Sequence, residues 1–183
     1  MRDHRLEADP LPREVDGAVL RRLAVSDLPA FQAYRNDSLL GRYQGWSAKS
    51  DAEAGAFLAR MSAAELFEPG VWAQIGIADL HGLLIGDIGL LLATDGQHAE
   101  IGITLRRESQ GCGIGTAAAR EAIDILFERT DAESVLGIAD ARNAQSIRLL
   151  QRVGMRMLES RSAVYRDEPC IDHVYAVTRR ISC

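Results

Sequence analysis

The sequence predicts a single-domain, mixed α/β protein built on a mixed, mostly antiparallel sheet of about seven strands. Its 183 residues suit one domain with one sizeable core. Three apolar runs rich in Ile and Leu, separated by short polar turns, occupy residues 71–105 and predict an antiparallel meander. Segments with helical periodicity precede and follow this meander, so helices and strands belong to one fold.

The N-terminal part begins with a segment that has no strong pattern. Residues 1–16 are polar and contain two prolines, so we expect a loose arm before a domain over residues 17–183. The apolar stretch 17–24 predicts a first strand. Ser26 is expected to cap a helix over residues 26–36, in which a proline is tolerated in the first turn.

The middle of the chain combines a helix with the meander. Ser50 and Glu53 have the spacing of a capping box, which predicts a helix that starts there and continues for about three turns. The three strands of the meander are then expected over residues 71–78, 83–93 and 99–105.

The C-terminal part opens with a glycine-rich loop. Three glycines occur within residues 111–115, and an alanine-rich helix with a 3.6-residue period follows directly from Ile114. A strand, a second helix that ends at a glycine and two last strands are expected over residues 134–140, 143–154, 155–166 and 172–179.

Composition excludes several classes of protein. The chain has 21 basic and 26 acidic residues, a formal net charge of −5, which argues against nucleic-acid binding. No apolar run approaches the length of a membrane span, and no signal-peptide pattern is present at the N-terminus. The odd set of cysteines, Cys112, Cys170 and Cys183, lacks metal-ligand spacing. We therefore expect reduced thiols, no metal, no membrane partner and a cytoplasmic location.

The glycine-rich loop is the strongest candidate for a ligand site. Clustered glycines allow either a positive φ or close approach of a ligand to the main chain, and the helix N-terminus that follows favours an anion such as phosphate. Residues 113–118 satisfy G-x-G-x-x-A, the dinucleotide-binding pattern, and Asp140 ends the next strand. However, the loop follows a meander and only about seventy residues remain, too few for the other half of that fold. A Walker A loop would need a lysine after the glycines, and none is present.

The residues before the glycines favour another family. Gln110 to Gly115 fit Q/R-x-x-G-x-G/A, and in this respect the sequence resembles the coenzyme A loop of the GCN5-related N-acetyltransferases. Residues 143–155, NAQSIRLLQRVGM, resemble the second signature of that family. Finer features resemble the branch that acetylates ribosomal-protein N-termini and some aminoglycosides: RYQGW at 42–46, LIGDIGL at 84–90, Ser146 three residues after Asn143, and DHVYAV at 172–177.

The resemblance implies a fold and a coenzyme site. Residues 17–183 would form the N-acetyltransferase domain, with helices on both faces of a twisted sheet and a parallel pair of strands, 99–105 and 134–140, that splay apart. Acetyl-coenzyme A would lie in this gap as a cosubstrate. The implied coenzyme-binding residues are two whose backbone pairs with pantetheine, Ile103 and Leu105, and the loop with the helix after it: Gln110, Gly111, Cys112, Gly113, Ile114, Gly115, Thr116 and Asn143. Cys112 is expected to act only as a spacer.

The resemblance also implies proton-transfer groups. A neutral amine must attack the thioester, and Glu100 matches the general-base glutamate of the histone-acetylating members. Asp87 and Glu159 are the other carboxylates that strand alternation could aim inward. The tyrosine that many relatives use to protonate the thiolate is replaced by Leu150, so this role falls to Ser146. Ser146 could equally bond a nearby carbonyl in the first turn, and Asn143 could be only a helix cap.

The implied activity is acetyl transfer to a primary amine: a protein N-terminus, an aminoglycoside or another small amine. Tyr43, Trp46 and Asp87 are expected to border the acceptor, and Arg107, Arg148 and Arg152 are possible partners of the coenzyme 3′-phosphate. The alternative is a non-catalytic module that senses acyl-coenzyme A, which the missing tyrosine favours. Strands near the C-terminus could also pair across a homodimer.

Overall fold

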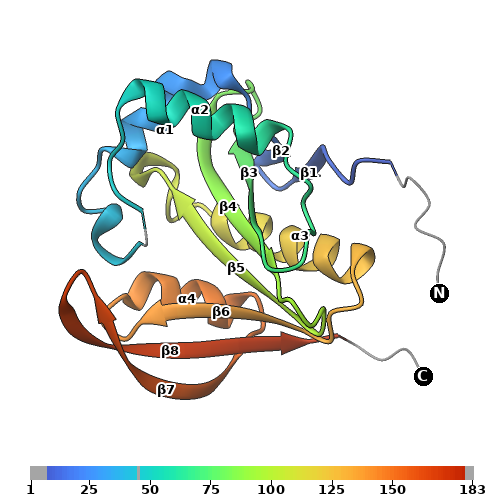
Figure 1. Ribbon diagram of the computed structural model, residues 1–183, viewed down its shortest axis with the longest axis vertical. Helices are drawn as coiled ribbons and strands as arrows, with labels where there is room; N and C mark the ends of the chain where they lie inside the picture. Colours follow the sequence, from blue (N-terminus) through green and yellow to red (C-terminus); the bar gives the residue numbers. More distant parts are fainter. Residues whose placement is uncertain (1–7, 45, 180–183) are drawn as a thin grey trace.

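The protein contains one twisted eight-stranded sheet with the order β1-β2-β3-β4-β5-β6-β8-β7. The computed structural model describes residues 8–44 and 46–179, and Figure 1 shows their arrangement. The strands are β1 (Arg13–Val15), β2 (Ala18–Arg22), β3 (Trp72–Ala78), β4 (Leu84–Leu92), β5 (His98–Leu105), β6 (Ser134–Asp140), β7 (Arg156–Tyr165) and β8 (Glu168–Thr178). The expected meander is confirmed as β3, β4 and β5, which pair antiparallel in sequence order.

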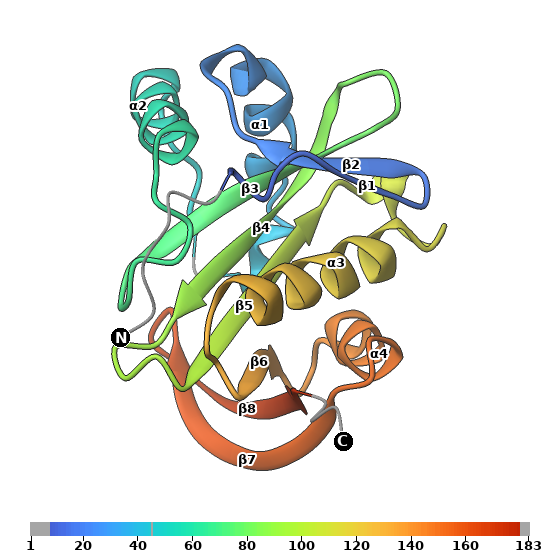
Figure 2. The same ribbon diagram turned by 90° about the vertical axis from the view of Figure 1, so that its right-hand side faces the viewer.

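Two pairs of helices cover the sheet. They are α1 (Leu28–Arg35), α2 (Asp51–Ser62), α3 (Ile114–Arg129) and α4 (Ala144–Arg152). Buried side chains form two clusters, one beneath α1 and α2 and a larger one between α3 and the central strands. Figure 2 shows α3 and α4 together on one side of the sheet, away from α1 and α2. The predicted fold class, with helices on both faces, is therefore confirmed.

β5 and β6 form the only parallel pair among the strands that the structure describes. Their pairing runs from His98 opposite Ser134 to Ile101 opposite Gly137 and then stops, although both strands continue. On its other side β5 remains paired with β4 as far as Leu105. The predicted splay between these two strands is thus present.

The expected loose arm over residues 1–16 needs a correction. Arg13–Val15 form β1, which pairs with β2 and is the strand beyond the seven expected. Its Arg13 side chain also bonds Glu121 at 3.3 Å and Glu128 at 2.6 Å on α3. A three-residue strand carries too short a pattern to be recognised in the sequence. Residues 1–7 of the expected arm lie outside the described residues.

One predicted cap is confirmed and another is wrong. Ser50 and Glu53 form the expected capping box at the start of α2. Ser26 does not cap α1, because residues 25–27 form a 3-10 turn and α1 starts at Leu28. Asp27 makes the local bonds instead: it accepts from the Ala24 N–H at 2.8 Å and pairs with Arg21 at 2.7 Å. Serine and aspartate are both good cap residues, so the sequence alone does not separate them.

A buried ion pair fixes α1 to β4. Asp87 is 1% exposed and Arg35 is 6% exposed, and one guanidinium nitrogen contacts both carboxylate oxygens at 2.7 and 2.8 Å. The Tyr34 hydroxyl donates to the same carboxylate at 2.5 Å. Burial, followed by the charge of Asp87, holds the pKa of Tyr34 well above its usual range. The oxygens of Asp87 are therefore buried and already bonded, which argues against a role as the base, and its expected place beside the acceptor stays a prediction.

Removing one partner of this pair should destabilise the protein strongly. Asp87→Ala leaves the Arg35 charge buried without its counter-ion, and we expect a loss of about 3–5 kcal/mol in the free energy of unfolding, measured by urea denaturation. Asp37→Ala, which removes the partner of Arg107 in an exposed pair, is the matched control and should lose far less. Equal losses in the two variants would mean that the buried pair does not hold α1 on the sheet.

Candidate coenzyme and acceptor site

The end of β5 presents unpaired backbone groups to the gap beside β6. The Arg106 N–H donates to the Ile85 carbonyl of β4. Because hydrogen-bonding residues alternate along an antiparallel pair, the N–H and C=O groups of Ile103 and Leu105 point away from β4. No β6 residue pairs with either of them in the described sheet. These are the two residues expected to pair with pantetheine, and the gap has the form of a missing strand.

Two glutamine side chains bind the carbonyls at this edge. The Gln44 amide donates to the Ile103 carbonyl at 3.3 Å, and the Gln110 amide donates to the Leu105 carbonyl at 2.7 Å. The Gln110 oxygen also accepts from the Gln145 amide of α4 at 2.6 Å. Gln110 therefore connects the end of β5 with the start of α4 across the mouth of the gap.

Two different physical reasons explain why the three loop positions are glycine. Gly111 and Gly113 have φ of +81° and +94°, and nothing lies within 4 Å of a Cβ built at either position. Backbone conformation therefore requires glycine there, and the space beside both is open. Gly115 has no such φ, and its Cβ would lie 3.1 Å from the Leu149 side chain. Close packing of α3 on α4 therefore explains Gly115, whereas backbone conformation explains Gly111 and Gly113.

The loop leads straight into the N-terminus of α3. Gly113 is the cap residue, and its carbonyl accepts from the N–H groups of Thr116 and Ala117, each at 3.0 Å. Thr116, expected among the coenzyme-binding residues, therefore has its N–H already bonded. The amides before it, at residues 111–115, belong to the turn and first helical positions that lack intrahelical partners. Cys112 is exposed, and its thiol donates to the Ser109 carbonyl at 3.1 Å, a contact compatible with the expected spacer role.

The start of α4 lies at the other side of the gap. Asn143 is a helix cap, and its side-chain oxygen accepts from the Ser146 N–H at 3.1 Å. The Ser146 side chain is half-buried. Leu150, which stands where many relatives have a tyrosine, is 4% exposed and belongs to the core, where it packs over Gly137 of β6. An apolar core side chain thus fills that position.

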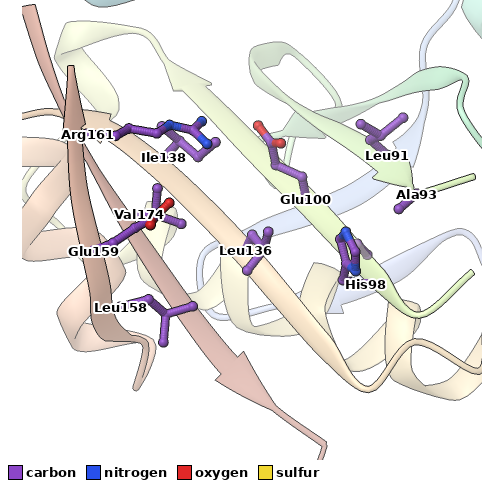
Figure 3. A pocket seen from close by; sticks show the side chains of 11 residues that line it. Leu91, Ala93, His98, Glu100, Leu136, Ile138, Leu158, Glu159, Arg161 and Val174 are labelled. Carbon is purple, nitrogen blue, oxygen red and sulfur yellow. The ribbon is translucent and has the colours of Figure 1, made fainter. Parts of the chain in front are cut away.

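A pocket of about 420 Å³ lies between β5 and β7. Figure 3 shows Glu100 reaching into it from β5, and Arg161 extending from β7 on the opposite wall. The floor and sides are mainly apolar, formed by Leu91, Ala93, Ala99, Leu136, Ile138, Leu158 and Val174. His98 and Glu159 complete the lining. The pocket therefore combines an apolar surface with a few charged groups, as small-molecule sites commonly do.

Desolvation dominates the electrostatics of Glu100. Burial raises the pKa of its carboxyl group above the usual value, the Arg161 cation lowers that pKa, and the Asp172 carboxylate raises it. A carboxylate in such a setting is a stronger base than one in water. Glu100 is therefore suited to accept a proton at the pocket wall.

Tyr43 and Trp46 lie outside the lining of this pocket. The Trp46 ring covers the Arg35 guanidinium at 4.5 Å, and its N–H donates to the Thr104 hydroxyl of β5 at 3.4 Å. Tyr43 lies against the Arg42 and Arg142 guanidiniums at 5.3 and 5.8 Å. Both aromatic rings therefore have structural partners. Gly45 of the RYQGW segment lies outside the described residues, as does Cys183.

The pocket brings together two of the predicted carboxylates, Glu100 and Glu159, but not Asp87. Arg161 was missed in the sequence, although strand alternation places it on the same face as Glu159. The alternation in the sequence indicates a shared face. Only the folded structure shows that this face of β7 lies across the pocket from β5. Of the three arginines considered for the 3′-phosphate, Arg107 is instead paired with Asp37 at 2.8 Å.

Two further findings concern ligands and membranes. Within the described residues, no group of three or more His, Cys, Asp or Glu side chains could hold a metal ion. No helix in the same part of the chain is long and apolar enough to cross a bilayer.

Comparisons with known proteins agree with this architecture. A family model described as an acetyltransferase (GNAT) domain matches residues 18–156. No curated protein matches the sequence. Among solved structures, a GNAT-family acetyltransferase from Bacillus anthracis superposes with a TM-score of 0.81 at 16% identity, over 92% of this chain and 98% of that one.

Two other similar structures contain coenzyme A. Spermidine N-acetyltransferase from Vibrio cholerae, in complex with coenzyme A and spermine, has a TM-score of 0.76 at 16% identity, over 89% of this chain and 96% of that one. RimL, a ribosomal alpha-N-protein acetyltransferase in complex with coenzyme A, has a TM-score of 0.75 at 17% identity, over 90% and 98%. At these identities the likeness concerns the fold.

The environment of Glu100 predicts an upward-shifted titration. The carboxyl group should protonate at a higher pH than the ordinary value of 4.5, and Arg161→Met should raise its pKa further because a cation is removed. The pH dependence of the carboxyl ¹³C shift measures this directly. Arg156→Met, on the same strand but outside the pocket, is the control and should leave the midpoint in place. A midpoint that Arg161→Met leaves unchanged would contradict the electrostatic account.

Proposed function

Because the chain belongs to the GNAT acetyltransferase family, we propose that it transfers the acetyl group of acetyl-coenzyme A to a primary amine. The observation that carries this proposal is the gap beside β5, where one strand edge has no partner strand and the glycine loop lies at the mouth. The acceptor pocket with Glu100 opens beside the same pair of strands.

The residues of the gap fit the coenzyme. Open space beside Gly111 and Gly113, at the N-terminus of α3, suits a pyrophosphate. The backbone groups of Ile103 and Leu105 are oriented to pair with the amides of pantetheine, once Gln44 and Gln110 give up their contacts. Residues 17–183 form the acetyltransferase domain in this proposal. When bound, the coenzyme supplies the acetyl thioester, and the protein supplies positioning and proton transfer.

The proton on the amine goes to Glu100. Primary amines have pKa values of roughly 8 to 10, so most acceptor molecules carry a proton at neutral pH. The raised pKa of Glu100 reduces the free-energy difference between this carboxylate and the amine, which favours proton transfer. The neutral nitrogen then attacks the carbonyl carbon directly, an amide bond forms and the carbon–sulfur bond breaks. Glu159 lines the same pocket and is the alternative base.

The thiolate that departs takes a proton from Ser146. This hydroxyl lies in the first turn of α4, beside the gap, and Asn143 fixes that turn through the Ser146 N–H. Leu150 cannot serve, because it is apolar and buried. The nitrogen loses its second proton as the amide forms, and this proton restores the Ser146 hydroxyl through solvent, while Glu100 returns the first proton to solvent. Overall, an ammonium ion and the thioester give an amide, a neutral thiol and one released proton.

A second candidate function rests on Leu150. With the usual acid replaced by a core residue, the fold could bind acyl-coenzyme A without turnover and act as a sensor. Release of free thiol separates the two candidates, since a sensor binds the coenzyme and acetylates no amine. In both the sequence analysis and this proposal the acceptor is a primary amine: a protein N-terminus, an aminoglycoside or another small amine.

Thiol release during incubation with acetyl-coenzyme A and a panel of amines tests the main proposal. Glu100→Gln should lower kcat by roughly 10²–10⁴-fold, the usual scale for one acid–base group, and raising the pH should restore part of the loss. Ser146→Ala should lower kcat without such rescue. Glu133→Gln, an exposed glutamate outside the pocket, should behave as wild type. Tight coenzyme binding without acetylation of any amine would instead favour the sensor.

The glycine loop allows a separate test of coenzyme binding. Gly113→Ala forces a side chain into a left-handed conformation where the ligand should lie, and we expect affinity for coenzyme A to fall about tenfold or more in calorimetry. Gly82→Ala is a matched control, since Gly82 has a φ of +86° and open space but lies in the β3–β4 turn. Its folding cost should be similar and its coenzyme affinity unchanged. Equal affinities in both variants would contradict the phosphate-loop assignment.

A further inference from the structure

Arg161 stands out among the groups that line the acceptor pocket. It extends from β7 toward the wall that carries Glu100, across an apolar floor that includes Ile138 (Figure 3). The proposed chemistry uses Glu100 and leaves this guanidinium without a role.

Among the described residues, the exposed Arg161 guanidinium acts on Glu100 only through its charge. The side chain forms neither a hydrogen bond nor an ion pair with any of these residues, although Asp172 is its cross-strand neighbour and Glu159 precedes it by two residues. Many other arginines near the site are bonded, such as Arg35 to Asp87 and Arg142 to Asp140. An arginine fork offers several N–H donors in one plane, a geometry that matches a carboxylate.

We propose that the acceptor is a small molecule that carries a carboxylate as well as its amine, with the carboxylate bound by Arg161. The amine lies against Glu100, and the apolar part of the acceptor packs on Leu136, Ile138 and Val174. This inference rests on the proposed acetyltransferase function and narrows its substrate to amino acids and related amino carboxylates.

The charges around the pocket support this class of acceptor. The groups that face it are His98 and Glu100 from β5 and Glu159 and Arg161 from β7, and Asp172 of β8 lies next to them. His98 is exposed and lies 3.7 Å from Asp95, which leaves Arg161 as the cation inside the described lining. A polyamine that filled the pocket would bring a second ammonium group toward this guanidinium, a like-charge contact. A carboxylate at the same place gains a charge-assisted hydrogen bond.

Pairs of acceptors that differ only in the carboxylate test the inference. We would compare L-phenylalanine with phenethylamine, L-lysine with cadaverine and 6-aminohexanoate with pentylamine, by thiol release from acetyl-coenzyme A. In the wild-type enzyme kcat/KM should favour the carboxylated member of at least one pair by about ten- to a hundredfold. The phenylalanine and 6-aminohexanoate pairs also distinguish an α-amino from an ω-amino carboxylate.

Variants of Arg161 then test whether this residue causes the preference for carboxylated acceptors. Arg161→Met should abolish it, and Arg161→Glu should reverse it in favour of cadaverine. Because Arg161 also affects the pKa of Glu100, the readout is the ratio within each pair, in which a change in the base cancels. Arg156→Met, exposed on the same strand and outside the pocket, should preserve the wild-type ratio.

Binding of the products gives a readout that does not depend on turnover. N-acetyl-L-phenylalanine should show stronger ligand-observed NMR signals with wild-type protein than N-acetylphenethylamine, and Arg161→Met should remove that difference. Acetylation of spermidine or phenethylamine without any preference for a carboxylate would overturn the inference and leave the proposed function intact. If no amine is acetylated, the proposed function fails. The role of Arg161 is overturned separately if wild-type protein binds N-acetyl-L-phenylalanine and N-acetylphenethylamine equally.

Discussion

The loss of a partner on one side of β5 is the constraint on which the rest of the site depends. After Ile101 the strand keeps its bonds to β4 but has no neighbour toward β6. Exposed strand edges are generally a liability, and here glutamine side chains bind the two free carbonyls. The glycine loop and the start of α4 lie around the space that this separation creates, and the pocket at Glu100 lies next to the stretch where β5 and β6 are still paired.

A second group of interactions fixes α1 and the segment before α2 on the sheet. The buried pair between Arg35 and Asp87 holds α1 against β4, and the same guanidinium carries the Trp46 ring, whose N–H bonds Thr104 on β5. The Trp46 carbonyl in turn accepts from Arg166 in the turn between β7 and β8 at 2.9 Å. The segment before α2 is thus tied to three separate parts of the fold.

Local patterns in the sequence predicted the local features. The meander, the capping box at Ser50, the helix after the glycine loop and the parallel splay all follow from short motifs or from the family resemblance. Long-range electrostatics was not predictable in this way. Arg35 and Asp87 are 52 residues apart, and nothing near Asp87 in the chain indicates that its charge is neutralised. Arg161 shares this difficulty, because its meaning depends on β7 lying opposite β5.

The conformation of the glycine loop has a thermodynamic consequence for ligand affinity. Gly111 and Gly113 hold left-handed conformations, and Gln110 anchors the loop to the end of β5 and to α4. Because bonds within the chain hold this loop, the entropy lost in ordering it is part of the free energy of folding and not of ligand association. A ligand that meets such a loop keeps more of its interaction energy as affinity.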